Sequence, residues 1–145
     1  MREILFRGKK QNGEWLQGDL VHYGDKILIF SENAQNSPDY YEVEPETVGQ
    51  FIGLTDKNGV KIFEGDILSC CKKASLYKNF PIEIIGIVFF HKGIYEVETK
   101  KVINKQFSNQ SSIFFGVQPM DWIHLPEFHK SEIIGSIHEN PELLK

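Results

Sequence analysis

The chain is patterned as short apolar runs separated by polar turns that contain glycine. Between residues 94 and 100, Tyr95, Val97 and Thr99 alternate with Glu96 and Glu98, which predicts a half-buried antiparallel strand. Comparable runs predict strands near 4–6, 20–23, 26–30, 51–54, 60–63, 67–72, 82–91 and 132–138. The pattern therefore predicts a fold that is mainly β, with little helix.

Glycine-containing pairs mark the predicted turns. Asn58-Gly59 predicts a two-residue hairpin turn of type I′, because Asn tolerates and Gly prefers the positive φ angles that this turn requires. Gly65-Asp66 predicts a corner before a strand, and we favour this over a catalytic role for Asp66. A weaker copy of the same pattern lies near the N-terminus. The predicted turn residues are Asn12, Gly13, Gly18, Asp19, Asn58, Gly59, Gly65 and Asp66.

The strand pattern predicts two regions, a β-rich N-terminal part over residues 1–50 and a small closed barrel over 51–145. Gly86 interrupts the long apolar run 82–91, which indicates the sharp bend that small barrels need. Pro45 suits the first position of a single helical turn, which we expect at 45–48.

The composition supports strands over helices. The 145 residues include 11 Phe, 5 Tyr and 2 Trp, whereas Ala occurs only at positions 34 and 74. Several aromatic residues lie in or beside polar segments, so they either complete a core that is poor in Leu and Val or form a binding platform on the surface. These residues are Tyr23, Tyr40, Tyr41, Tyr77 and Phe80.

The net charge of −4 lies in the first third of the chain. Residues 1–50 hold five Lys or Arg against nine Asp or Glu, whereas residues 51–145 hold eleven of each. Residues 72–105 hold seven Lys against three Glu, which suits either a solvated surface or nucleic acid. The candidate nucleic-acid-binding residues are Lys72, Lys73, Lys78, Lys100, Lys101 and Lys105.

The sequence lacks the motifs of several common catalytic, cofactor-binding and metal-binding sites. No glycine-rich segment is followed by Lys and a helix, as a phosphate loop requires, and no dinucleotide fingerprint occurs. The five His and the adjacent Cys70-Cys71 lack metal-ligand spacing, and no Ser lies in a nucleophile motif. We therefore expect no catalytic residue, cofactor, metal or membrane span. Two Cys without a secretion signal indicate reduced thiols in a cytoplasm.

Five segments together resemble the YopX family of phage and prophage proteins. They are MREILFRG at 1–8, GEWLQGDL at 13–20, PETVGQFIGLTDKNG at 45–59, IFEGDI at 62–67 and IIGSIHENPEL at 133–143. The resemblance implies a β-rich N-terminal part followed by an SH3-like barrel. It also implies a phage or prophage origin in a bacterium, so we expect the protein in the cytoplasm of a bacterial host. The family is largely without an assigned activity, so no catalytic residue is transferred to this chain.

Taken together, we expect a non-enzymatic phage accessory protein that serves as a binding or assembly module. Exposed strand edges and surplus aromatic residues favour self-association into a homo-oligomer. The alternative is a small barrel that binds nucleic acid through the lysines named above. A second alternative is an enzyme, which requires a pocket where a Cys or His meets a carboxylate.

Overall fold

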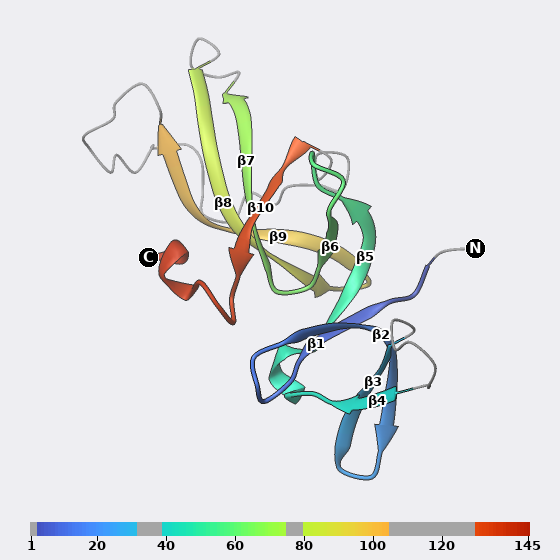
Figure 1. Ribbon diagram of the computed structural model, residues 1–145. Coiled ribbons are helices and arrows are strands. Elements are labelled where there is room, and N and C mark those ends of the chain that lie inside the picture. The colour runs from blue at the N-terminus through green and yellow to red at the C-terminus, as the bar shows by residue number, and fades with distance from the viewer. Residues whose placement is uncertain (1–2, 32–38, 75–79, 105–129) are drawn as a thin grey trace. The chain divides into compact units, whose positions relative to one another are not determined.

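The computed structural model describes residues 3–31, 39–74, 80–104 and 130–145, without the side chains of 71–74, 80–82, 102 and 104. Contacts within the chain divide it into two compact units, Met1–Gly53 (unit 1) and Leu54–Lys145 (unit 2). Antiparallel strands make up most of both units, and the described helical segments are single 3₁₀ turns (Figure 1). The prediction of a mainly β fold is confirmed.

Unit 1 is built on an antiparallel sheet in the order β4-β3-β2-β1-β5. β5 runs through Gly53 into unit 2, where β6 is its neighbour. A 3₁₀ turn, η1, follows the expected Pro45 and covers Pro45–Thr47. The strands are β1 (Phe6–Lys9), β2 (Trp15–Tyr23), β3 (Lys26–Ser31), β4 (Asp39–Glu42) and β5 (Gly49–Thr55).

The core face of unit 1 is unusually tight. Ile29 is fully buried and Val43 nearly so, and a Cβ atom added to Gly8 would lie 2.8–3.1 Å from both side chains. The buried Thr47 ties η1 to β1, because its hydroxyl accepts a hydrogen bond from the Lys9 N–H at 2.9 Å and donates one to the Glu44 carbonyl at 2.7 Å. Gly8 therefore lets β1 approach Ile29 and Val43 closely.

Gly18-Asp19 is not a corner, which corrects the sequence-based prediction. β2 continues through Gly18, which pairs with Phe6 of β1, while Asp19 pairs with Phe30 of β3. A Cβ atom at Gly18 would lie 1.7 Å from the Phe30 carbonyl oxygen. Gly18 is therefore required where the main chains of β2 and β3 come together, and its role is close approach rather than a turn.

The turn at Asn12-Gly13 connects β1 to β2. Lys10 and Glu14 close the loop through a main-chain hydrogen bond of 2.9 Å, and the side chain of Asn12 accepts a hydrogen bond from the Glu14 N–H at 3.1 Å. Gly13 has a φ of 88°, which glycine adopts without strain.

Unit 2 contains a four-stranded antiparallel sheet in the order β10-β7-β8-β9. Within the described residues these strands form an open sheet, so the SH3-like barrel expected for 51–145 is not confirmed. A second 3₁₀ turn, η3, covers Pro141–Leu144. The strands of unit 2 are β6 (Lys61–Phe63), β7 (Asp66–Ala74), β8 (Phe80–His91), β9 (Ile94–Asn104) and β10 (Glu132–Ser136).

The core of unit 2 is larger and mainly apolar. Ile62, Phe63, Ile67, Leu68, Val88 and Val97 are each no more than 1% exposed. Gly86 lies at a register shift opposite β9, and a Cβ atom there would lie 2.5 Å from the Val97 side chain and 2.6 Å from the Glu98 carbonyl oxygen. The expected irregularity at Gly86 is thus a β-bulge in the β8–β9 pair.

The Asn58-Gly59 turn differs from the predicted type. A main-chain hydrogen bond of 2.8 Å closes the loop between Asp56 and Val60, so three residues form the turn. Gly59 has a φ of 81°, but Asn58 keeps a negative φ. This is the three-residue hairpin loop with glycine in the left-handed position. The register between β5 and β6 differs from that of a two-residue turn.

We predict that Gly18→Ala severely destabilises unit 1, because the new methyl group meets main-chain atoms that cannot rotate away. The expected loss is about 3 kcal/mol or more in the free energy of unfolding. The measurement is urea denaturation followed by tryptophan fluorescence, to which Trp15 of unit 1 contributes, with the midpoint compared with that of the wild-type chain.

Gly24→Ala is the matched control, because Gly24 has a φ of 59° and open space around it. Its cost is limited to the left-handed backbone conformation, about 1 kcal/mol. Equal losses for the two variants would contradict the close approach at Gly18.

Candidate functional site

The sheet of unit 1 has a second face, opposite its core, that carries aromatic side chains. Residues opposite each other in an antiparallel sheet share a face. The register Asp19↔Phe30↔Tyr40 and Val21↔Leu28↔Glu42 therefore gives two rows across β2, β3 and β4, and Tyr23↔Lys26 gives a third row across β2 and β3. We call this surface the outer face; it consists of Asp19, Val21, Tyr23, Lys26, Leu28, Phe30, Tyr40 and Glu42.

None of the eight residues of the outer face is buried, whereas Ile29 and Ser31, which alternate with them on β3, are buried. Tyr23 is 72% exposed and Tyr40 is 56% exposed. The rings of Phe30 and Tyr40 lie 5.2 Å apart, so these side chains form one continuous aromatic surface. For Tyr23 and Tyr40, the interpretation as core-filling aromatic residues is wrong.

The remaining aromatic candidates differ. Tyr41 lies on the opposite face and is half-buried, and its hydroxyl donates a hydrogen bond to Asp39 at 3.1 Å. That bond raises the pKa of Tyr41 above its usual value. Lys10 lies 4.4 Å from the centre of the Tyr41 ring. Tyr77 lies outside the described residues, as does the side chain of Phe80.

Basic side chains extend the aromatic surface along β1 and the start of β2. The register Arg7↔Gln17 and Lys9↔Trp15 places these residues on the same side of the sheet as Asp19. The guanidinium carbon of Arg7 lies 4.9 Å from the centre of the Trp15 ring, and the Lys9 amino group lies 5.8 Å from it. The cations of the chain itself thus already contact Trp15, whereas Tyr23 and Tyr40 remain exposed.

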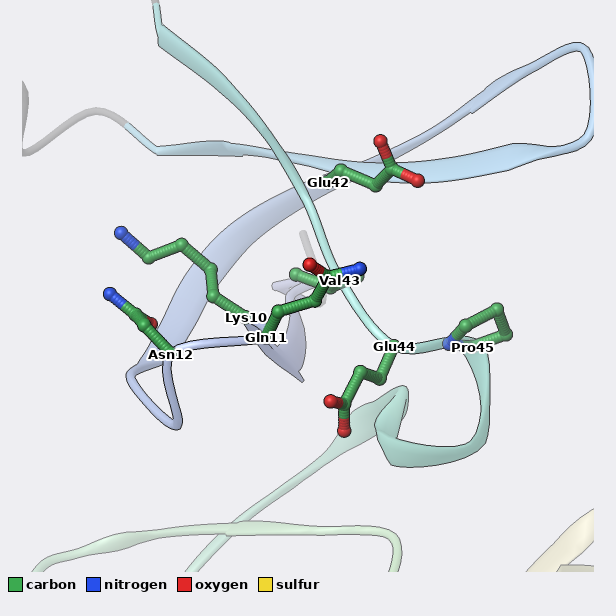
Figure 2. A pocket seen from close by; sticks show the side chains of 7 residues that line it. All are labelled: Lys10, Gln11, Asn12, Glu42, Val43, Glu44 and Pro45. Carbon is green, nitrogen blue, oxygen red and sulfur yellow. The ribbon is translucent and has the colours of Figure 1, made fainter.

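A pocket of about 330 Å³ lies in unit 1 between the β1–β2 turn and the segment after β4. Figure 2 shows the side chains of Lys10 and Asn12 extending to one side, while the carboxylates of Glu42 and Glu44 point in opposite directions. All seven lining residues are described, and none is Cys or His. Because its polar groups diverge, the pocket lacks the arrangement that general acid–base catalysis requires.

Two buried carboxylates in unit 2 accept hydrogen bonds from main-chain N–H groups. Asp66 accepts a hydrogen bond from the Phe63 N–H at 2.8 Å, beside Gly65 with a φ of 79°. Asp56 accepts hydrogen bonds from the N–H groups of Asn58 at 2.8 Å, Val60 at 2.9 Å and Ile133 at 3.2 Å. The geometry therefore gives Asp66 the corner role expected from the sequence, and it gives Asp56 a role that the sequence analysis missed.

Burial alone would raise the pKa of the Asp56 carboxyl, but the hydrogen bonds from Val60, Ile133 and Asn58 outweigh it and lower the pKa below its usual value. A carboxylate held ionised in this way is a poor proton donor at neutral pH. Asp56 joins the β5–β6 loop to β10 across 77 positions of sequence. A Lys57–Glu132 ion pair of 2.6 Å and a hydrogen bond from the Lys57 N–H to Ser131 support the same junction.

The tip of the β8–β9 hairpin carries two exposed apolar side chains on opposite faces, because Phe90 is paired with Tyr95 and Ile94 with His91. Phe90 is 55% exposed and Ile94 is 46% exposed, on either side of the Lys92-Gly93 turn. Both turn residues have positive φ angles, 49° and 89°, which defines a tight two-residue turn. The rings of Phe90 and Tyr95 lie 5.0 Å apart. We call Phe90 and Ile94 the hairpin tip.

The lysines proposed for nucleic-acid binding are only partly described. Lys100 contacts the carboxylate of Glu98, and the Lys101 amino group donates a hydrogen bond to the Lys145 carbonyl oxygen at 3.3 Å. Lys72 and Lys73 lie on β7 opposite Ile82 and Pro81, without described side chains. Lys78 and Lys105 lie outside the described residues. Nucleic-acid binding through these six residues stays a prediction.

Among the described residues, no group of three or more His, Cys, Asp or Glu side chains is arranged to hold a metal ion. In the same part of the chain, no helix is long and apolar enough to cross a membrane.

Comparison with protein families matches residues 5–145 to the family described as YopX protein. The chain belongs to the YopX family. A comparison with curated proteins finds no match. Among solved structures, the YopX chain is similar to protein EF1440 from Enterococcus faecalis, with 22% identity, full coverage of both chains and a TM-score of 0.51. At that identity the likeness shows the fold alone.

The YopX motif residues have structural roles in this chain. Gly8 and Gly18 permit close packing, Thr47 ties η1 to β1, and Gly65 begins the corner before β7. Gly135 lies against Asn140, whose side-chain oxygen would be 2.5 Å from an added Cβ atom. The described motif residues that carry the resemblance thus maintain the fold, while the aromatic residues Tyr23, Phe30 and Tyr40 lie outside the motifs.

The sequence contained a signal for the outer face that the strand predictions did not use. Residues 27–30 form an uninterrupted apolar run, Ile-Leu-Ile-Phe, so both faces of this strand are apolar. In an antiparallel sheet with one core, the second apolar face lies outside. The Asp19-x-Val21-x-Tyr23 alternation on the preceding strand gives the same signal.

We predict that Asp56→Asn lowers the free energy of unfolding by about 2 kcal/mol at neutral pH, because it removes hydrogen bonds to a charged, buried acceptor. The folded-state pKa is lowered, so this stabilisation is fully present above the ordinary carboxyl pKa and disappears as the pH falls. The difference between wild type and variant should therefore shrink below about pH 4.

The measurement is urea denaturation followed by circular dichroism at a series of pH values. Asp25→Asn is the control, because Asp25 is an exposed turn residue whose loss should change stability by no more than about 0.5 kcal/mol. A pH-independent difference between wild type and Asp56→Asn would show that the carboxylate charge at Asp56 is not what stabilises the junction.

Proposed function

We propose that this YopX chain is a non-enzymatic binding module that holds a protein partner on the outer face of unit 1. The observation that carries the proposal is the aromatic surface of the outer face, where the exposed Tyr40 contacts the half-buried Phe30 in one row and the exposed Tyr23 lies two rows away, on a sheet whose opposite face forms the core. Contiguous exposed apolar surface on a folded domain is typical of interaction sites. Tyr is also favoured at interfaces, since it contributes large contact area and a polar group.

The non-enzymatic part of the proposal is supported by how the chain uses its reactive groups. The buried carboxylates of Asp56 and Asp66 are engaged by main-chain donors. The polar groups of the described pocket diverge. Each of these features serves the fold rather than a reacting centre.

The phage or prophage context is part of the same proposal. Family membership supports it, because the YopX resemblance implies this origin and the motif residues are in place. An accessory protein with a binding role and no reaction of its own fits a family whose shared residues maintain turns and close packing.

The test is affinity capture from the native host cells, using the wild-type chain and a Tyr23→Ser, Tyr40→Ser double variant, with mass spectrometry of the bound proteins. Both side chains are exposed, so the double variant should fold normally. We expect at least one protein that the wild type retains and the double variant loses, because the contact area of both rings is removed.

Val60→Ser is the matched control, since Val60 is 53% exposed but lies in unit 2, outside the outer face. It should retain the same partner as the wild type. Partners that bind all three chains equally would refute a binding role for the outer face.

We further propose that the chain forms a homo-oligomer through the hairpin tip. Phe90 and Ile94 lie on opposite faces beside a tight turn, and each exposes apolar area that self-association would remove from water. Sedimentation at increasing concentration should give a mass above that of the monomer for wild type, and Phe90→Ser should shift the equilibrium toward the monomer. A monomer mass for the wild type at high concentration would exclude the oligomer.

A further inference from the structure

The chain contains two Asn-Gly pairs, Asn12-Gly13 and Asn58-Gly59, and both lie in three-residue hairpin loops of the same type. Gly13 has a φ of 88° and Gly59 a φ of 81°. Each glycine N–H donates a hydrogen bond to the carbonyl of the residue before its loop, at 2.8 and 3.0 Å. Both asparagines are exposed to solvent. The main chains of the two loops are therefore matched, and the loops differ in their side-chain interactions.

An Asn-Gly pair can lose ammonia without an enzyme, because glycine has no side chain to keep its nitrogen away from the neighbouring side-chain carbonyl. The glycine nitrogen attacks Cγ of Asn, the Cγ–Nδ2 bond breaks, and the proton of the attacking N–H leaves with the amide as ammonia. Water then opens the resulting cyclic imide at either carbonyl, which gives Asp or isoaspartate. Negative charge develops on Oδ1 during ring closure, so a hydrogen-bond donor there accelerates the step and a nearby carboxylate slows it.

In the β5–β6 loop, the Asp56 carboxylate opposes ring closure at Asn58. Its Oδ1 accepts hydrogen bonds from the N–H groups of Asn58 at 2.8 Å and Val60 at 2.9 Å, so the main chain is held on both sides of Gly59. Its Oδ2 lies 3.4 Å from Nδ2 of Asn58. The lowered pKa of Asp56 keeps the carboxylate ionised at neutral pH, so a negative charge faces the group that must itself become negative.

The β1–β2 loop has Lys10 at the position that Asp56 occupies in the other loop. Here Oδ1 of Asn12 accepts a hydrogen bond from the Glu14 N–H at 3.1 Å, which places a main-chain donor on the oxygen that becomes negative. The Lys10 amino group pairs with the Glu14 carboxylate at 2.6 Å and offsets its charge. The side-chain interactions of this loop therefore favour the reaction that those of the β5–β6 loop oppose.

We infer that Asn12 is a site of spontaneous deamidation in the folded protein, and that Asp56 protects Asn58 from the same reaction. Asn12 lines the pocket of unit 1 together with Glu42 and Glu44 (Figure 2), so the reaction adds a negative charge to the pocket wall. The isoaspartate product also inserts a carbon atom into the main chain of the loop that joins β1 to β2.

The experiment follows both pairs in the full chain during incubation at physiological temperature and mildly alkaline pH, once folded and once in urea that unfolds the chain. Pepsin digestion at low pH and mass spectrometry measure the conversion of Asn12 and Asn58 in the same sample. In the folded chain, we expect Asn12 to react about fivefold faster than Asn58, as for one partly screened charge interaction. In urea, where neither loop is formed, the two rates should become similar.

Lys10→Asp places a carboxylate at the equivalent position of the β1–β2 loop and should slow the reaction of Asn12 about fivefold. Lys10→Ala is the matched control, because it removes the same amino group without adding an acceptor. Asn12 should react faster in Lys10→Ala than in Lys10→Asp. The rate at Asn58, which belongs to the other unit, should be unchanged in both variants.

A folded chain in which Asn12 does not react, or reacts no faster than Asn58, would overturn the inference. A faster reaction of Asn12 that persists in urea would also overturn it, because the folded loops would then not decide the rates. Equal rates of Asn12 in Lys10→Asp and Lys10→Ala would overturn the protective role of the carboxylate. These outcomes are independent of partner binding on the outer face.

Discussion

The close approach of main chains at Gly8 and Gly18 is the constraint on which unit 1 depends. It brings β1, β2 and β3 so near to one another that Ile29 lies against both glycines and Val43 against Gly8. Tyr23, Phe30 and Tyr40 lie on the other face, where Tyr23 and Tyr40 are exposed to solvent, whereas Tyr41 lies on the core side and is half-buried. A tight core and an open aromatic surface thus occupy the two faces of one sheet.

Unit 2 is held together differently. Its apolar core is large, and a single carboxylate, Asp56, connects the β5–β6 loop to β10 through main-chain donors. Charge-assisted hydrogen bonds in a buried site are stronger than neutral ones, and here they tie segments that are distant in sequence. The YopX motif includes both Asp56 and the glycine of its loop, which explains why that motif concerns folding more than chemistry.

Local structure was largely predictable, because strands and turns follow from the period of apolar residues and from glycine. The strand of 94–100, the 3₁₀ turn after Pro45 and the corner at Gly65 were each expected and are present. The Asn58-Gly59 pair predicted a hairpin but not its length, because the Asp56 carboxylate favours a three-residue loop. The turn predicted at Gly18-Asp19 was wrong, because the residues next to Gly18 in the sequence do not indicate its close approach to β3. The outer face was recognisable only in part, through single aromatic residues next to polar segments.

The sequence by itself determined that the chain is a β protein of the YopX family with glycine-defined turns, because these properties depend on residues near one another along the chain. The tertiary structure decided which of two apolar strand faces became the core, and that Asp19, Phe30 and Tyr40 lie in one row. It also joined Asp56 to Ile133. The reason is physical: alternation defines two faces of a strand, but only pairing with other strands determines which face is covered and which is open to solvent.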